Sequence, residues 1–312
     1  MLSRVANQIF WMSRYMERAE SMARILGVTS NLVLFGTGDV RAQNLLAPLA
    51  ITDLVEEFKT KHSQLTLATL IDYLGFDEDN PSSIFSCLKA ARANAHAVRW
   101  QITSEMWETL NATWIEMRTT RRESVSGGDA TRFFDWVKER SHLFRGVTSG
   151  TVMRGEAFDF SRVGTFLERA DNTARILDVK YHAVLPSVDD VGGAVDYYQW
   201  TSLLRSVSAF ETYRGLYRDQ IYPIKVAELL VLEKRMPRSL AACMEQVNQA
   251  LQRIEGQKDG SAKRLAGELN VRLTYSEMEE IFASGLHEYL EECITDIAEL
   301  DNRIQRAYLG VV

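Results

Sequence analysis

The sequence has few residues that interrupt helices or build covalent frameworks. It contains 5 Pro and 3 Cys in 312 residues. Because proline breaks helix interiors, so low a content favours an all-helical chain. The cysteines, at positions 87, 243 and 293, have no metal-type spacing. Their odd number, without a secretion signal, predicts reduced thiols and a cytoplasmic location.

Long apolar runs and an excess of positive charge are also missing. No run reaches the roughly 18 apolar residues that a membrane span needs. The first twenty residues carry charges within their apolar pattern, which argues against a signal peptide. The formal net charge is −6, which gives no support for a nucleic-acid-binding surface. The sequence therefore predicts no membrane segment and no nucleic-acid partner.

Motifs for nucleotide binding, nucleophilic catalysis and metal binding are missing as well. The sequence has no GxGxxG, no P-loop and no nucleophile elbow. The five histidines are widely separated and make no metal motif. We expect no metal and no cofactor, and these absences leave open whether the protein is an enzyme.

What the sequence does contain is a repeated phrase. Residues 15–26 read YMERAESMARIL and residues 166–177 read FLERADNTARIL, so that Glu17 corresponds to Glu168. NPSSIFSCL at 80–88 and MPRSLAACM at 236–244 extend the duplication. Similarity at a nearly fixed offset argues for two copies of one unit. Cys87 and Cys243 hold equivalent places, and we interpret both as small buried apolar residues.

The apolar periodicity predicts an all-α fold. Ile9, Met12, Met16, Ala19, Ala23 and Leu26 recur at steps of three and four, and the second copy keeps the same face. We predict a helical bundle of two pseudo-symmetric repeats, about 1–140 and about 150–312, packed as one body in a single domain over 1–312. The repeated helices, about 3–34 and 156–184, should lie near an approximate two-fold axis.

Turn residues predict where other helices begin and end. Asn80 is expected to be an N-cap with Pro81 at the first helical position. A long helix should follow through Trp100, Trp107 and Trp114, and the last helix should run from about Ser276 to Tyr308. Loops are expected at 36–39, 126–129, 185–193 and 255–261.

Charged residues flank the apolar face of both repeated helices. Within each ER dipeptide, the glutamate and the arginine point in different directions and should have different partners. A carboxylate and an arginine spaced i, i+4 complete one ridge in each copy. Glu17, Glu20 and Arg24 form the ridge of the first copy and Glu168, Asp171 and Arg175 that of the second, while Arg18 and Arg169 lie on the opposite flank.

Four interpretations of these ridges are open. They can be structural ion pairs between neighbouring helices, a solvated face, an anion or substrate site with arginines as donors, or a carboxylate-bridged metal site. Di-iron bundles need Glu-x-x-His, which this sequence lacks. If the pairs are structural, at least three of Glu17, Arg18, Glu168 and Arg169 should be buried and paired.

A segment at 141–160 leads into the second repeated helix and holds Arg154 and Glu156. Its glycines, Gly146 and Gly150, are unusual inside a helix and are expected to permit close packing. The segment can be a bent helix that approaches a ligand or a plain helix junction. We expect any open site where the two ridges and the Arg154–Glu156 segment converge.

These stretches resemble the bacterial alpha-E family, a domain of unknown function. The resemblance rests on MLSRVANQIFWMSRYMERAE, on NPSSIFSCLKAARANAHAVRWQITSEMWETLN, on the long segment from SHLFRGVTSG to DVKYH and on GLHEYLEE. It covers essentially the whole chain. The resemblance implies a cytoplasmic bacterial protein whose partners are an ATP-grasp protein and a transglutaminase-like peptidase.

Two functions from different classes follow. The first is a non-catalytic or accessory protein that acts with the ATP-grasp ligase in amide-bond or peptide synthesis or modification. The second is an enzyme of the same pathway that uses the Glu/Arg ridges on a small anionic or peptide substrate, with a carboxylate as general base. The oligomeric state is not indicated by the sequence.

Overall fold

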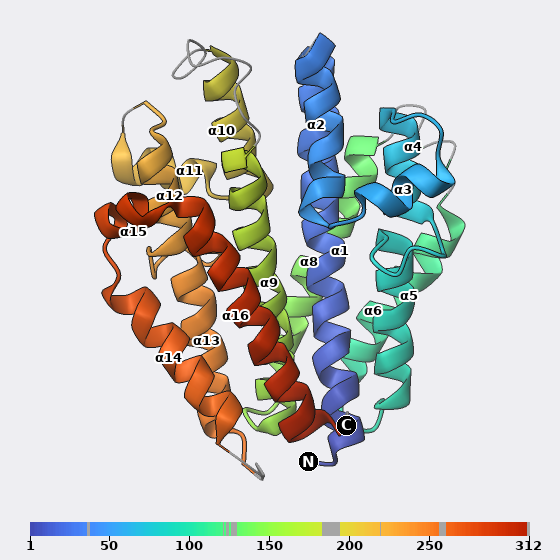
Figure 1. The fold of residues 1–312 in the computed structure, drawn as a ribbon. Coiled ribbons are helices and arrows are strands. Elements are labelled where there is room, and N and C mark those ends of the chain that lie inside the picture. Colours follow the sequence, from blue (N-terminus) through green and yellow to red (C-terminus); the bar gives the residue numbers. More distant parts are fainter. Residues whose placement is uncertain are drawn as a thin grey trace.

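The computed structural model describes residues 1–35, 38–120, 122, 125, 130–182, 194–218, 220–255 and 260–310, and every regular element in these ranges is a helix (Figure 1). The predicted all-α fold is therefore confirmed. The helices are α1 (Ser3–Phe35), α2 (Gly38–Ile51), α3 (Val55–Lys61), α4 (Leu67–Ile71), α5 (Ile84–Ala97), α6 (Ser104–Thr119), α8 (Ala130–Thr151), α9 (Glu156–His182), α10 (Ala194–Ser206), α11 (Phe210–Tyr217), α12 (Pro223–Val231), α13 (Leu240–Arg253), α14 (Ser261–Tyr275), α15 (Met278–Ser284) and α16 (Leu286–Ile304), with π-helical turns at Asp72–Phe76 and Gln305–Leu309.

The two repeated helices, α1 and α9, lie side by side in the centre of the molecule (Figure 1). Their apolar faces are almost fully buried, including Ala19 and Ala23 on α1 and Ala170 and Ala174 on α9. Small side chains on both faces allow the helix axes to approach closely. This pair forms the core on which the remaining helices pack.

The same set of neighbours surrounds each central helix. On one side α5 and α8 pack on α1, and α6 packs on both of them. On the other side α13 and α16 pack on α9, and α14 packs on both of those (Figure 1). The packing of helices is thus alike in the two halves. That they are pseudo-symmetric repeats about a two-fold axis stays a prediction.

The start of α5 differs from the prediction. Ser83, not Asn80, is the N-cap, and its hydroxyl accepts the N–H of Ser86 at 3.1 Å. The amide of Asn80 instead donates to the Tyr73 carbonyl and accepts the Ser82 N–H, at 3.1 and 2.9 Å. Asparagine stabilises turns by such contacts as readily as it caps helices, so the sequence signal was ambiguous.

Two predicted long helices are interrupted. The helix expected through Trp100 ends at Ala97, and Thr103 caps the next one by accepting the Met106 N–H. The helix expected from Ser276 to Tyr308 breaks at Gly285, whose φ of 104° is not helical. That conformation strongly favours glycine, so Gly285 separates α15 from α16.

Some of the predicted loops lie outside the described residues. The loops at 126–129 and 185–193 do so completely, and those at 36–39 and 255–261 do so at positions 36, 37 and 256–259. Gly38 and Asp39, predicted as loop, belong to α2. The repeated helices end close to the predicted positions, at Phe35 and His182.

A glycine does permit close packing of two helices, but it is Gly164 and not one of the predicted glycines. Gly146 and Gly150 lie in exposed parts of α8, and a Cβ at either would meet no atom within 4 Å, so their expected role in close packing was wrong. Gly164 of α9 is the close contact, because a Cβ there would collide with the carbonyl oxygen of Phe10 on α1. One turn along α1, the hydroxyls of Ser13 and Ser161 lie 2.8 Å apart.

Gly164→Ala should therefore lower the free energy of unfolding by about 1–3 kcal/mol, because the added methyl forces α1 and α9 apart. Gly146→Ala is the matched control and should raise it by up to about 1 kcal/mol, since alanine favours an exposed helix. Denaturant unfolding of both variants checks this. Equal effects of the two substitutions would contradict the close approach at Gly164.

Candidate functional site

The two ER dipeptides meet at the crossing of α1 and α9 and exchange partners reciprocally. Arg18 donates through Nε and Nη2 to the two carboxylate oxygens of Glu168, at 2.6 and 3.0 Å. Arg169 donates through the same two nitrogens to Glu17, at 2.9 and 2.8 Å. Both are bidentate pairs, the strongest geometry for arginine and carboxylate. As predicted, the glutamate and the arginine of each ER dipeptide have different partners, and each of these pairs joins one central helix to the other.

This group is buried. Glu17, Glu168 and Arg169 are 1, 2 and 6% exposed, and Arg18 is partly buried. Three of the four residues thus meet the expectation of burial and pairing. Buried carboxylates are tolerated only when they are paired and hydrogen-bonded, so the cluster holds α1 against α9 in a single register.

Further arginines complete the coordination of the glutamates. Arg14 contacts Glu168 at 2.8 Å and Asp301 of α16 at 2.7 Å. On the other side, Arg238 contacts Glu17 at 2.9 Å and Glu20 at 2.7 Å. Arg238 precedes α13, so the cluster ties both central helices to the second half of the molecule.

Glu20 is the most heavily coordinated carboxylate. Besides Arg238 it contacts Arg145 of α8, the hydroxyl of Ser141 at 2.7 Å and its own-helix neighbour Arg24 at 2.7 Å. Arg24 also lies 3.1 Å from the Nε2 of His142. Both oxygens of this carboxylate are therefore occupied by groups of the protein itself.

The arginines decide the ionisation of these glutamates. Burial alone would raise the pKa of Glu168, but Arg18 and Arg14 lower it to about 2. Burial would likewise raise the pKa of Glu17, but Arg169 and Arg238 outweigh that effect and lower it. A carboxylate that is this acidic is a weak proton acceptor, so these two glutamates fit a structural role better than that of a general base.

The second copy of the outer ridge is different. Arg175 contacts Asp171 at 2.9 Å, which repeats the i, i+4 pair of Arg24 and Glu20. Burial raises the pKa of Asp171, and Arg175 only partly offsets it. Arg175 is the one hydrogen-bond or ion-pair partner that the structure shows for Asp171 in the described part of the chain.

A charged cleft of about 320 Å³ opens beside this second ridge. Four elements form it: α1, α9, the end of α2 with the turn after it, and the loop before α5. We call it the Asp171 cleft. Its lining residues are Arg18, Met22, Ile51, Thr52, Asp53, Ser82, Glu168, Asp171, Asn172 and Arg175.

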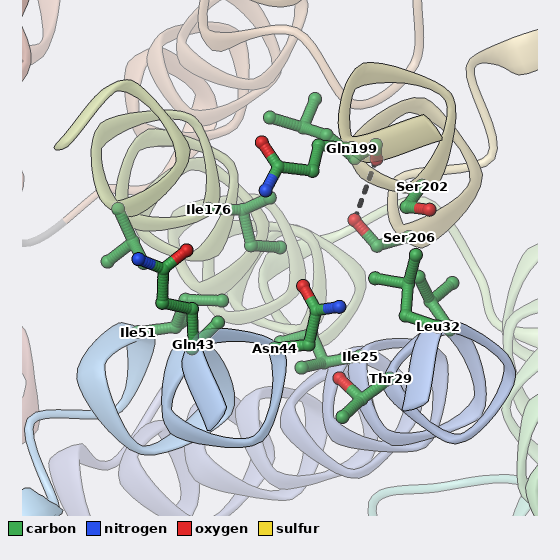
Figure 2. A pocket seen from close by; sticks show the side chains of 14 residues that line it. Ile25, Thr29, Leu32, Gln43, Asn44, Ile51, Ile176, Gln199, Ser202 and Ser206 are labelled. Carbon is green, nitrogen blue, oxygen red and sulfur yellow. Dashed lines mark hydrogen bonds between the residues drawn. The ribbon is translucent and has the colours of Figure 1, made fainter. Parts of the chain in front are cut away.

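An apolar cavity of about 90 Å³ lies further along the same two helices (Figure 2). Ile25 of α1 and Ile176 of α9 form part of its wall, and Figure 2 shows the amide side chains of Gln43, Asn44 and Gln199 around it. Ile51 lines both this cavity and the Asp171 cleft. The two spaces are therefore neighbours.

Arg154 and Glu156 do not join the ridges. The guanidinium of Arg154 lies 3.9 Å from the centre of the Phe158 ring and donates to the Ser149 carbonyl at 2.8 Å. Glu156 pairs with the amino group of Met1. Both lie at the start of α9, while the ridges lie in its middle, so the expected convergence was wrong. The helix start predicted at about residue 156 is confirmed, but this start lies away from the ridges.

The residues that sequence reasoning missed come from outside the repeated phrase. Arg238, Asp301 and Asp53 reach the site from other elements, and nothing in their own local sequence indicates this. The one usable signal was the substitution within the second duplicated segment, where Arg238 replaces Ser82.

The two equivalent cysteines stand beside the cluster, Cys87 near Arg18 and Cys243 near Arg169. Burial raises the pKa of both Cys87 and Cys243 to about 12, so the thiols stay protonated at neutral pH. Within the described ranges, no three His, Cys, Asp or Glu side chains are grouped so that they could hold a metal ion. None of the described helices is long and apolar enough to cross a membrane.

Comparison with known proteins identifies relatives of the chain. The alpha-E family model, described as a predicted alpha-helical domain with a conserved ER motif, matches residues 1–309. Uncharacterized proteins of Mycobacterium bovis and of two Mycobacterium tuberculosis strains are each 24% identical, over 94% of this chain. The chain spans 35% of the length of these relatives. No solved structure matches it.

Glu168→Ala should lower the free energy of unfolding by about 3–5 kcal/mol, because it leaves Arg14 and Arg18 buried without their shared partner. The melting temperature measures this. Glu139→Ala, on an exposed position of α8, is the control and should change stability by less than about 0.5 kcal/mol. An unchanged melting temperature of Glu168→Ala would contradict the structural role.

The cluster also predicts a pH dependence. The pKa of Glu168 is lowered from 4.5 to about 2 on folding, so its stabilising contribution is present above pH 4.5 and is lost as the pH falls through about 2. Chemical unfolding between pH 6 and pH 2 should show this loss in the natural protein. Glu168→Gln should reduce the slope in that window, and an identical slope would count against the lowered pKa.

Proposed function

Because the chain belongs to the alpha-E family, we propose that it is an accessory protein that holds a substrate for an ATP-grasp ligase and a transglutaminase-like peptidase. The system would make or modify amide bonds of a peptide in the cytoplasm. The partners follow from the family resemblance. What the chain contributes follows from its own geometry.

The observation that carries the proposal is the Asp171 cleft. It is open, charged and built on the central helix pair, which the buried cluster holds in one register. Arg175 is 34% exposed and lies in the wall beside Asp171. Such a cleft can orient a charged substrate, while the neighbouring apolar cavity can take an uncharged part of it.

Two further observations support an accessory role over independent catalysis. Glu17 and Glu168 are occupied by arginines, which lower the pKa of both carboxyl groups and leave them unsuited to proton abstraction. The mycobacterial relatives are also about three times as long as the chain, so in them the matching unit is part of a longer polypeptide. An alpha-E unit that works with a second domain or protein fits both observations.

An enzymatic role is the second candidate, and one observation favours it. Burial raises the pKa of Asp171, which improves a carboxylate as a general base, and Asp171 lines the open cleft. Turnover of a peptide or amide substrate by the isolated chain, without an ATP-grasp protein, would support this role and overturn the accessory one.

Arg175→Glu should abolish substrate capture in a mixture of this chain and its ATP-grasp partner, because it removes the cleft's donor for a carboxylate of the peptide and breaks the ion pair that holds Asp171 in the cleft wall. Capture is measured by mass spectrometry of the material that co-purifies with the tagged chain. The matched control is Arg303→Glu on α16, which breaks another i, i+4 pair at similar exposure, 33%. Capture that survives in Arg175→Glu, or is lost equally in both, would contradict the proposal.

A further inference from the structure

The loops before α5 and α13 are built in the same way. Their capping residues, Ser83 and Ser239, each donate to the carbonyl oxygen six residues earlier, at 2.6 and 2.7 Å. The cysteine four residues after each cap lies 3.7 Å from the carbonyl oxygen of the proline in its loop. Because the two backbones match, Ser82 stands in its loop where Arg238 stands in the other.

The two loops face equivalent carboxylates with different side chains. Arg238 bridges Glu17 and Glu20 at 2.9 and 2.7 Å and fills the space between them. Glu168 and Asp171 are the corresponding residues of α9, and the Asp171 cleft lies beside them. The short side chain of Ser82 lines that cleft and makes no bridge to either carboxylate. The cleft is thus the space that an arginine occupies in the other half.

The charges differ in the same sense. We call the surroundings of Glu17 and Glu20, where Arg238 sits, the filled side, and those of Glu168 and Asp171 the open side. On the filled side, four arginines surround the two glutamates: Arg24, Arg145, Arg169 and Arg238. On the open side, around Glu168 and Asp171, there are three arginines, Arg14, Arg18 and Arg175, and Asp53 adds a third carboxylate to the cleft. A single positive group is missing from the open side, at the position where the filled side has a guanidinium.

We propose that the Asp171 cleft binds a guanidinium or ammonium group of a ligand, bridged between Glu168 and Asp171 as Arg238 is bridged between Glu17 and Glu20. A lysine or arginine side chain of a peptide carries such a group. This assignment deepens the proposed function and rests on it for the nature of the ligand, but the cation site itself rests on the cleft.

The arginines that line the cleft do not prevent this binding. Arg238 lies beside Arg169 and Arg24 on the filled side, where the carboxylates outweigh the repulsion between them. Arg18 and Arg175 have the equivalent places on the open side, and both are already paired with the carboxylates. A bound cation would also offset the burial that raises the pKa of Asp171.

The test uses the purified full chain and two small probes. Agmatine carries a guanidinium, and cadaverine carries only ammonium groups. Calorimetric titration at low ionic strength should show saturable binding of one probe molecule per chain. Tighter binding of agmatine identifies a guanidinium ligand, and equal binding identifies a general cation site. Failure of both probes to bind would overturn the proposal.

Ser82→Arg is the decisive variant, because it should fill the cleft as Arg238 fills the other side. It should weaken probe binding by at least about tenfold, which corresponds to about 1.4 kcal/mol, and raise the melting temperature. Ser82→Ala is the matched control and should bind as the natural chain does. Asp171→Asn should weaken binding similarly, and it keeps the test decisive if Ser82→Arg does not fold. Unchanged binding in the folded variants would overturn the proposal.

This outcome is separable from that of the proposed function. Probe binding by the isolated chain does not require an ATP-grasp partner. Loss of co-purification with that partner, while agmatine still binds, would contradict the accessory role only. Co-purification without any probe binding would contradict the cation site only.

Discussion

The structure depends on two bidentate ion pairs exchanged between the central helices. Arg18 with Glu168 and Arg169 with Glu17 are removed from water, and such charges are tolerated only when the geometry is nearly complete. A shift of α1 along α9 by one turn would break both bidentate pairs. The pairs therefore hold the two helices at one register, and the close approach at Gly164 requires the same register.

That requirement is met differently in the two halves. Around Glu17 the remaining hydrogen-bonding capacity is used by arginines from α8 and from the loop before α13. Around Glu168 Arg14 takes up part of it, while Asp171 keeps a single partner among the described residues, at the edge of a cleft. The two carboxylates of the first copy are thus closed off by arginines from several elements, and those of the second copy stand beside an open cleft. In the proposed function, the stabilising role and the binding role are separated between the two copies.

Much of the architecture could be predicted from the sequence, because apolar periodicity and a repeated phrase are local signals. Both central helices, their buried alanine faces and the pairing of the ER residues followed from such signals. Helix ends were less predictable, because Asn80 and Ser83 are both able to cap and the turn decides between them. The break at Gly285 likewise depends on a backbone angle that the flanking helical pattern hid.

The sequence by itself determined that the chain is helical, that α1 and α9 carry equivalent charges, and that those charges stand beside apolar faces. Only the tertiary structure decided which charges are used up and which are left open. Arg238 and Ser82 are far along the chain from the carboxylates they face, and no local pattern relates them to Glu20 or Asp171. The reason is physical: the partners of a buried charge are set by the helices that pack on it, and packing joins residues that the sequence keeps apart.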